Sequence, residues 1–298
     1  MDTAVPTIVV GYDASPSSQL ALDWALTTAR EDGRRVDIVH AVPIETIPHL
    51  APATPFGWNP DTPLTAQDVR DEFVSEAMGR LPADRVRFRQ VPGSPSARLV
   101  GSASPQDLLV TGSRGHGTIH SALLGSTAYA VAAHAPCPVV IIRTSERATV
   151  ADRPGPDHPV LVGIDDIETS GAALDGAADW AARYAARLRI VRAVAFDALT
   201  FAGLPLFASD AELESSLKTH ADQTLVAAVE RVRATHPTLD VAASVVPGRP
   251  GIVLGHESRG AGLAVVGTRG RGGFAGLALG SVTHHVIHDA HCPVLIAR

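Results

Sequence analysis

The amino-acid sequence contains one glycine-rich pattern twice, about half a chain length apart. Residues 112–126 read GSRGHGTIHSALLGS and residues 267–281 read GTRGRGGFAGLALGS. Both segments have the spacing Gly, two residues, Gly, nine residues, Gly-Ser. Because the whole chain has 298 residues, the length of about two ordinary domains, this repetition predicts a duplicated domain.

The similarity extends outward from the two glycine-rich segments. IVVGYDASPSSQLALDWA near the N-terminus matches VLVGIDDIETSGAALDGA in the second copy, and APCPVVIIR in the first copy matches the C-terminal AHCPVLIAR. Residues 144–158, TSERATVADRPGPDH, are rich in charge, proline and glycine and read as a linker. We therefore expect one domain over residues 1–146 and a second over residues 157–298.

Each copy alternates short apolar runs with stretches of helical periodicity. Several runs are continuously apolar, which is typical of strands covered by helices on both faces of a parallel sheet. Ser15 and Pro16 provide an N-cap and a first helical residue, and Leu22 and Leu26 follow at helical spacing. The sequence predicts two tandem doubly wound α/β domains, a fold that binds ligands at the carboxyl ends of its strands. The expected strands of the first copy span residues 7–13, 36–42, 86–91, 107–113 and 138–143.

Charge and hydropathy argue against two classes of partner. The formal net charge is −6, so the chain lacks the basic footprint of a nucleic-acid-binding protein. No apolar run approaches the roughly 18 residues of a membrane-spanning helix, and the N-terminus carries Asp2 rather than a basic signal region. We expect a cytoplasmic protein with no membrane partner. Cys137 and Cys292 occupy matching positions without a CxxC pattern, which favours buried reduced thiols over a redox or metal site.

The glycine-rich segments join a predicted fourth strand to a predicted helix. The first leaves the strand at Gly112 and leads to a helix whose expected N-cap is Ser126. Glycines permit turns with positive φ that aim successive N–H groups at one anion, and a helix N-terminus adds its dipole. Asp13 and Asp165, each after the first strand of its copy, are expected to accept hydrogen bonds from a nucleoside hydroxyl. The alternative is that the glycines only make tight turns, inherited in both copies without a ligand.

Competing motifs fit less well. Lys218 is the only lysine of the chain, so a P-loop lysine is impossible and cationic help would come from Arg114, Arg269 or Arg271, if these are not simply solvated. GRGGFA in the second copy satisfies a relaxed dinucleotide fingerprint, but it follows the fourth strand instead of the first. Neither glycine-rich segment contains an acid, so we expect at most slow hydrolysis and assign no catalytic residue.

Histidines of the second copy offer a metal-like spacing. His284, His288 and His291 fall at i, i+4 and i+7 of the last expected helix. Their counterparts in the first copy are not histidines, and His291 is expected past the helix end. We therefore favour a surface or interface role and assign no metal site.

The chain resembles the universal stress protein family in its tandem two-domain form. The resemblance rests on VVGYD or LVGID, on VHAV, on the glycine-serine spacing and on the closing CPVVIIR or CPVLIAR. The resemblance implies Rossmann-like five-stranded sheets of order 3-2-1-4-5 that bind adenine nucleotide, ATP with or without Mg²⁺. It also implies pairing through the last strands, either within the chain or in a homodimer.

The resemblance assigns roles to individual positions. Asp13 and Asp165 would contact the adenosine, Ala41 and Ala193 would meet the adenine through their backbone, and the glycines with Ser126 and Ser281 would hold ribose and phosphates. The expected nucleotide-binding residues are Gly11, Asp13, Ala41, Thr111, Gly112, Gly115, Gly125, Ser126 and Thr127 in the first copy, and Gly163, Asp165, Ala193, Val266, Gly267, Gly270, Gly280, Ser281 and Val282 in the second.

Two differences between the copies put equal affinity of the sites in doubt. His40 beside the presumed adenine site becomes Arg192, and Asp107 before the fourth strand becomes Gly262. The favoured hypothesis is an ATP-binding regulator of stress response or dormancy that acts with an unknown regulatory protein. The alternatives are a weak ATPase and a structural dimerisation module without nucleotide.

Overall fold

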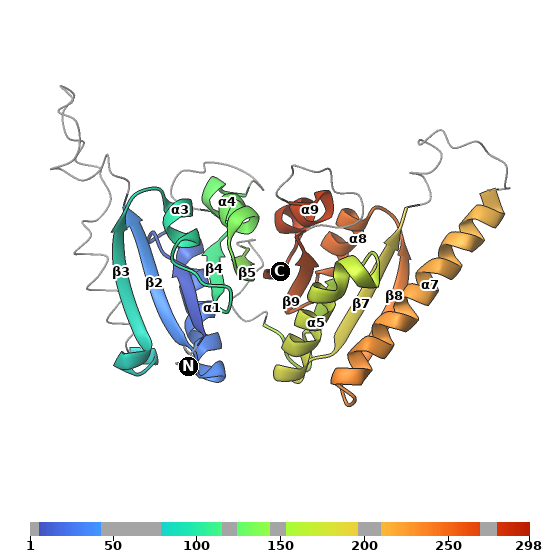
Figure 1. Ribbon diagram of the computed structural model, residues 1–298, viewed down its shortest axis with the longest axis horizontal. Helices are drawn as coiled ribbons and strands as arrows, with labels where there is room; N and C mark the ends of the chain where they lie inside the picture. Colours follow the sequence, from blue (N-terminus) through green and yellow to red (C-terminus); the bar gives the residue numbers. More distant parts are fainter. Residues whose placement is uncertain (1–5, 43–78, 115–123, 144–152, 196–209, 269–278) are drawn as a thin grey trace, which may run out of the picture. The chain divides into compact units, whose positions relative to one another are not determined.

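The computed structural model describes residues 6–42, 79–114, 124–143, 153–195, 210–268 and 279–298. The chain divides into two compact units, Met1–Thr144 and Ser145–Arg298. In Figure 1 the first unit is coloured from blue to green and the second from yellow-green to red.

The first unit contains a five-stranded sheet in the order β3-β2-β1-β4-β5. All pairs of neighbouring strands are parallel. The predicted order 3-2-1-4-5 is therefore confirmed for this unit. Its elements are β1 (Thr7–Gly11), α1 (Pro16–Asp32), β2 (Arg35–Val42), the 3-10 helix η2 (Ala83–Arg85), β3 (Val86–Pro92), α3 (Pro95–Val100), β4 (Leu108–Gly112), α4 (Ser126–His134) and β5 (Val139–Ile142).

The second unit repeats this topology. Its strands lie in the order β8-β7-β6-β9-β10 and again pair in parallel. With β6 as its first strand this is also the order 3-2-1-4-5, so the predicted doubly wound fold is confirmed in both units. Its elements are β6 (Val160–Gly163), α5 (Ile167–Arg183), β7 (Leu188–Val194), α7 (Asp210–Thr235), β8 (Val241–Pro247), α8 (Pro250–Glu257), β9 (Leu263–Gly267), α9 (Ser281–Asp289) and β10 (Val294–Ala297).

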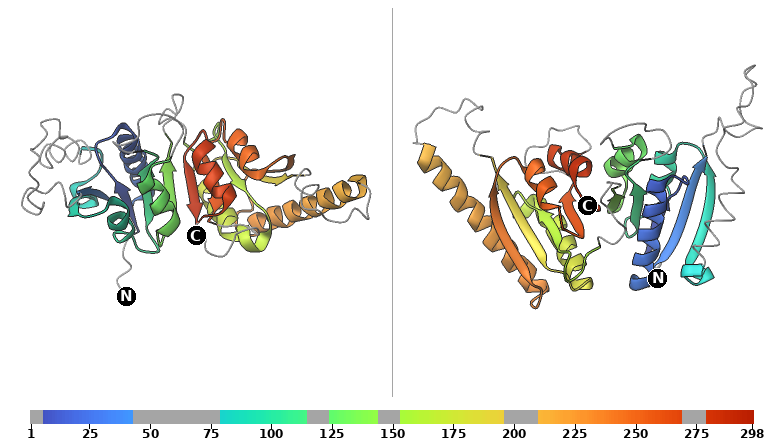
Figure 2. Two further views of the ribbon diagram at one scale, coloured as in Figure 1. Left: turned by 90° about the horizontal axis from the view of Figure 1, so that it is seen from above. Right: turned by 180° about the vertical axis from the view of Figure 1, so that it is seen from behind.

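Helices cover both faces of each sheet (Figure 2). In the first unit α1 lies against β4 and α3 lies against β2 and β1. Central strands are consequently buried on both sides, and Ile8, Val9 and Val10 of β1 are at most 1% exposed. This burial explains why the sequence shows continuous apolar runs in place of alternation.

The first helix begins as the sequence predicts. Ser15 is the N-cap of α1, its hydroxyl accepts a hydrogen bond from the Ser18 amide at 3.2 Å, and proline occupies the first turn. The helix ends at Gly33, whose φ of 75° is a left-handed conformation that glycine adopts without strain. Leu22 and Leu26 are buried against the sheet, as expected from their spacing.

The helices that follow the glycine-rich segments begin one residue before the prediction. The N-cap of α4 is Gly125, not Ser126, and the N-cap of α9 is Gly280. Gly125 has φ −65° and Gly280 has φ −69°, so neither residue uses the positive φ that glycine permits. An extended N-cap glycine directs the chain into the first turn and places no side chain over the helix end.

Two further expectations can be compared with the structure. Cys137 and Cys292 are completely buried thiols, as predicted. Within the described ranges, no helix is both long enough and apolar enough to cross a membrane.

Candidate functional site

A cavity of about 490 Å³ opens at the carboxyl ends of β1, β2 and β4 in the first unit. Its walls come from these strand ends, from Pro95 and Leu99 of α3, and from the first turn of α4. Gly115 lies outside the described residues. The other residues predicted for this site all line the cavity: Gly11, Asp13, Ala41, Thr111, Gly112, Gly125, Ser126 and Thr127.

Two strand-end glycines allow helices to approach the sheet closely. A Cβ on Gly11 would lie 2.8 Å from Leu99 Cδ1. A Cβ on Gly112 would lie 2.4 Å from Ser17 Oγ and 2.6 Å from the Ser17 carbonyl oxygen. Gly112 is therefore required by the packing of α1 on β4, a role that the sequence analysis did not foresee.

The start of α4 is an uncapped helix N-terminus that faces the cavity. Among the residues that the structure describes, no side chain caps it at Gly125, and the first intrahelical hydrogen bond runs from the Tyr129 amide to the Gly125 carbonyl. The preceding amides, of Ser126, Thr127 and Ala128, belong to residues that line the cavity. Such first-turn N–H groups have no intrahelical acceptor, and with the helix dipole they form a ready anion-binding site.

Asp13 is held at the rim of the same cavity. Its Oδ1 accepts hydrogen bonds from the Ser15 amide at 3.0 Å and from the Ser15 hydroxyl at 2.5 Å. The Asp13 amide donates to Ser18 Oγ at 3.3 Å. The serines of the α1 N-terminus thus fix the position of this exposed carboxylate, which an isolated strand end could not do.

The structure corrects the expected place of His40. Val39 and Ala41 of β2 line the cavity, and because successive strand residues point to opposite faces, His40 between them points away. Its ring Nδ1 lies 2.8 Å from the Tyr12 carbonyl oxygen, which assigns the Nδ1–H tautomer as the hydrogen-bond donor. His40 therefore supports the end of β1 and does not contact the space predicted for adenine.

The second unit has the corresponding residues at the same edge. Asp165 follows β6, Ala193 is near the end of β7, and β9 ends at Gly267. A Cβ on Gly163 would lie 2.4 Å from Leu254 Cδ1, which repeats the contact of Gly11 with Leu99. Gly270 lies outside the described residues. Val266 lies in β9 beside Gly267, and Gly280, Ser281 and Val282 form the start of α9.

The surroundings of these residues differ from those in the first unit. Arg192 Nη1 lies 3.6 Å from Asp165 Oδ1, whereas Asp13 receives a serine hydroxyl. Thr283 in the first turn of α9 donates its hydroxyl to the Gly267 carbonyl at 2.6 Å. The two halves therefore share backbone geometry but not electrostatics.

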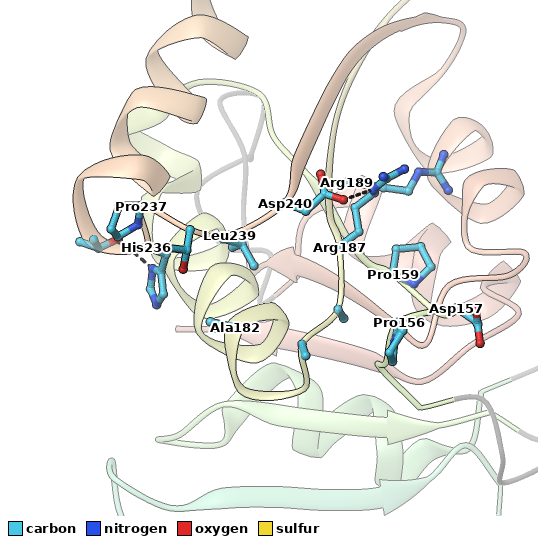
Figure 3. A pocket seen from close by; sticks show the side chains of 14 residues that line it. Pro156, Asp157, Pro159, Ala182, Arg187, Arg189, His236, Pro237, Leu239 and Asp240 are labelled. Atoms are coloured by element: carbon cyan, nitrogen blue, oxygen red, sulfur yellow. Dashed lines mark hydrogen bonds and ion pairs between the residues drawn. The ribbon is translucent and has the colours of Figure 1, made fainter.

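A larger cavity, of about 850 Å³, lies at the opposite edge of the second sheet, near the amino ends of β7 and β8 (Figure 3). The basic side chains on its wall lie beside carboxylates: Arg187 lies 2.7 Å from Asp240, Arg189 pairs with Glu257, and His236 lies 3.2 Å from Asp179. Ligands of this fold bind at the carboxyl ends of the strands, and this cavity lies near their amino ends, so it is not the predicted nucleotide site.

The histidines of α9 do not form a metal centre with other described residues. His291 follows the helix, which ends at Asp289, as expected. The rings of His284 and His288 lie 4.6 Å apart between centroids. No group of three or more His, Cys, Asp or Glu side chains in the described ranges is arranged to hold a metal ion.

Comparison with known proteins gives consistent matches over both units. The model of the universal stress protein family matches residues 5–143 and 158–298. Universal stress protein Rv2005c of Mycobacterium tuberculosis is 33% identical over 299 residues, which span 98% of this chain and 96% of that protein. The crystal structure of a universal stress protein from Archaeoglobus fulgidus is 18% identical, with a TM-score of 0.60 over 98% of this chain and 96% of its own, and shows the same fold. Another universal stress protein, solved in complex with cAMP, is 30% identical, with a TM-score of 0.34 over 48% of this chain and 100% of its own.

Proposed function

The chain belongs to the universal stress protein family, and on this premise we propose that it is a cytoplasmic ATP-binding regulator of stress response or dormancy. Each half would hold one adenine nucleotide at the carboxyl edge of its sheet. Bound nucleotide would set the conformation that a regulatory partner protein recognises.

One observation carries the proposal: in the first unit the uncapped start of α4 and the fixed carboxylate of Asp13 line the same cavity. Phosphates fit the first-turn amides, because these donors have no acceptor within the helix and lie at the positive end of its dipole. A ribose hydroxyl fits Asp13, which accepts hydrogen bonds. The volume of about 490 Å³ lies within the range of about 300–1,000 Å³ typical of small-molecule sites.

The base would occupy the part of the cavity lined by Val39, Ala41 and Leu99. These apolar side chains offer a flat ring dispersion contacts and removal from water. The backbone at Ala41, which lines the cavity beyond the last residue of β2 that pairs with β1, would supply the polar groups that recognise the edge of adenine. Mg²⁺, where present, would be coordinated mainly by phosphate oxygens and water.

Efficient hydrolysis is not part of the proposal. Asp13 is the one carboxylate among the described residues that line the cavity, and it is assigned to the ribose. The segment 112–126 contains no acid that could orient an attacking water. The chemistry on this wall therefore supports binding and not turnover.

Pairing through the last strands remains part of the proposal. β5 and β10 are the outermost strands of their own sheets in the order given above, and each consists of four apolar residues. Light scattering during size-exclusion chromatography, with and without ATP, distinguishes a monomer from a homodimer.

The proposal is tested by nucleotide content and by binding. We expect mass spectrometry of the denatured protein to detect co-purified adenine nucleotide, and calorimetry of the stripped protein to show two ATP per chain. Ala41→Phe fills the cavity and should remove one of the two sites. The matched control is Ala97→Phe, an exposed position of α3 outside the cavity wall, which should retain both.

Two results would contradict the proposal. A stripped, folded protein that binds no ATP at millimolar concentration would favour a structural dimerisation module. Unchanged stoichiometry in Ala41→Phe would show that nucleotide binds elsewhere.

A further inference from the structure

Arg192 is a buried cation beside the predicted ribose-binding acid of the second unit. The residue is 8% exposed, and its Nη1 lies 3.6 Å from Asp165 Oδ1. Nε and Nη1 have no hydrogen-bond acceptor among the described residues. A guanidinium in such a setting is attracted strongly to the nearest carboxylate, because burial removes the water that would otherwise satisfy it.

The first unit has no equivalent of this ion pair in its corresponding positions. His40, at the position of Arg192, bonds to the Tyr12 carbonyl and does not line the cavity. Ser15, which donates to Asp13, is replaced by Ile167, which has no hydroxyl. The longer arginine side chain starts from the same face of its strand as His40 but reaches the carboxylate of Asp165.

We propose that Arg192 makes the nucleotide site of the second half the weaker of the two, by holding Asp165 in an ion pair. The inference rests on the proposed function. A ribose hydroxyl can use Asp165 only in competition with the guanidinium, and the positively charged guanidinium is attracted to the carboxylate more strongly than a neutral hydroxyl is. Arg192 acts through Asp165 and is a positioning residue, since it extends toward the ribose end and the phosphates are assigned to the start of α9.

Single-site variants isolate the effect. Ala41→Phe leaves the second site and Ala193→Phe leaves the first, so calorimetry yields one dissociation constant for ATP from each protein. We expect the Kd of Ala41→Phe to be the higher one. Adding Arg192→His to Ala41→Phe should lower that Kd about fivefold, which corresponds to about 1 kcal/mol. Arg192→Lys, which keeps the charge, should change it less.

A second ligand separates this mechanism from a general change in structure. 2′,3′-Dideoxy-ATP lacks the hydroxyls that Asp165 would bind, so the gain from Arg192→His should be present with ATP and absent with the dideoxy ligand. Equal gains with both ligands, no gain, or weaker ATP binding would each overturn the inference. A weaker affinity would show that Arg192 contacts the nucleotide itself.

A reciprocal variant provides the second measurement if Arg192→His does not fold. His40→Arg in the Ala193→Phe background should raise the Kd of the first site, and an unchanged Kd would contradict the inference. Circular dichroism checks the folding of each variant. Wild-type protein that binds no nucleotide overturns the proposed function and the inference together, whereas two sites of equal affinity overturn the inference alone.

Discussion

The two halves of this protein have the same backbone arrangement at the sheet edge, but different side chains form hydrogen bonds with that backbone. The carbonyl of Gly112 accepts the hydroxyl of Thr111 at 3.3 Å, whereas the carbonyl of the corresponding Gly267 accepts the hydroxyl of Thr283 at 2.6 Å. The donor comes from a strand in the first half and from a helix in the second. Both halves thus keep a glycine carbonyl at the end of the fourth strand that needs a hydrogen-bond donor, but the threonine that donates to it comes from a different element in each half.

Buried charges differ in the same way. Asp37 of β2 is 3% exposed and accepts hydrogen bonds from Arg87 and Arg89 of β3. The corresponding Arg189 pairs instead with Glu257 of α8. In the first half, arginines of the edge strand β3 therefore neutralise a buried acid, and in the second half a glutamate of a helix pairs with a partly exposed arginine.

The largest expected effect tests whether glycine is required for packing at one position and not at another. Gly112→Ala should destabilise the protein by about 3 kcal/mol, because the added Cβ would meet the Ser17 backbone, which cannot move aside easily. Gly176→Ala in α5 meets nothing within 4 Å and should stabilise by about 0.5–1 kcal/mol. Urea unfolding followed by tryptophan fluorescence measures both. A small cost for Gly112→Ala would show that α1 can shift away from β4.

A smaller effect is expected from the buried acid of the first half. Burial raises the pKa of Asp37, but hydrogen bonds and charges from Arg89 and Arg87 outweigh it, so the pKa lies below 3.8. Asp37→Asn should cost about 2 kcal/mol at pH 7, since one partner of a buried pair is lost and the arginines remain partly solvated.

The sign of the pH dependence follows from this lowered pKa. The stabilisation by the Asp37 carboxylate is complete above the pKa of the unfolded chain, near 4, and is lost as the pH falls through the folded-state value. The difference between wild type and Asp37→Asn in urea unfolding should therefore shrink between pH 5 and pH 2. A constant difference over this range would contradict the role assigned to the charge.

A still smaller loss of stability is expected when the hydroxyl that donates to the Gly267 carbonyl is removed. Thr283→Val should cost about 1 kcal/mol, because the Gly267 carbonyl loses its buried partner. Adding Val266→Thr, which restores the arrangement of the first half, should recover part of this loss. Thr219→Val removes a similar side chain to backbone bond on the exposed face of α7 and should have almost no effect. Equal costs at Thr283 and Thr219 would show that burial of the carbonyl is unimportant.

The sequence was sufficient for the strand order and for the group of residues at the sheet edge. Apolar runs, the repeat and the glycine-serine spacing are local or symmetric signals, and the residues that they predict line the cavity of the first half. Strand alternation places His40 on the face opposite to Val39 and Ala41, although it is adjacent to both along the chain.

What the sequence did not reveal depends on contacts between distant segments. The close approach of Ser17 explains Gly112, and Arg87 and Arg89 explain why Asp37 can be buried. No periodicity encodes which residue faces another across a helix–sheet interface. For the same reason the pairing of Arg192 with Asp165 was not foreseen, although the substitution itself was visible.

The smallest expected effect concerns the histidines that only the second half carries. Burial, followed by the positive charges of His288 and His285, lowers the pKa of His284 below 6.5, while Asp289 acts in the opposite direction. Since the folded-state pKa lies below the unfolded value, the folded protein should lose stability as the pH falls below 6.5. The ring is largely exposed, so the loss should be about 0.3 kcal/mol. His284→Tyr introduces the residue of the first half, Tyr129, and urea unfolding at pH 7.5 and 5.5 should show less loss in this variant than in wild type. An identical loss in both proteins would assign the acid sensitivity to groups that the two halves share.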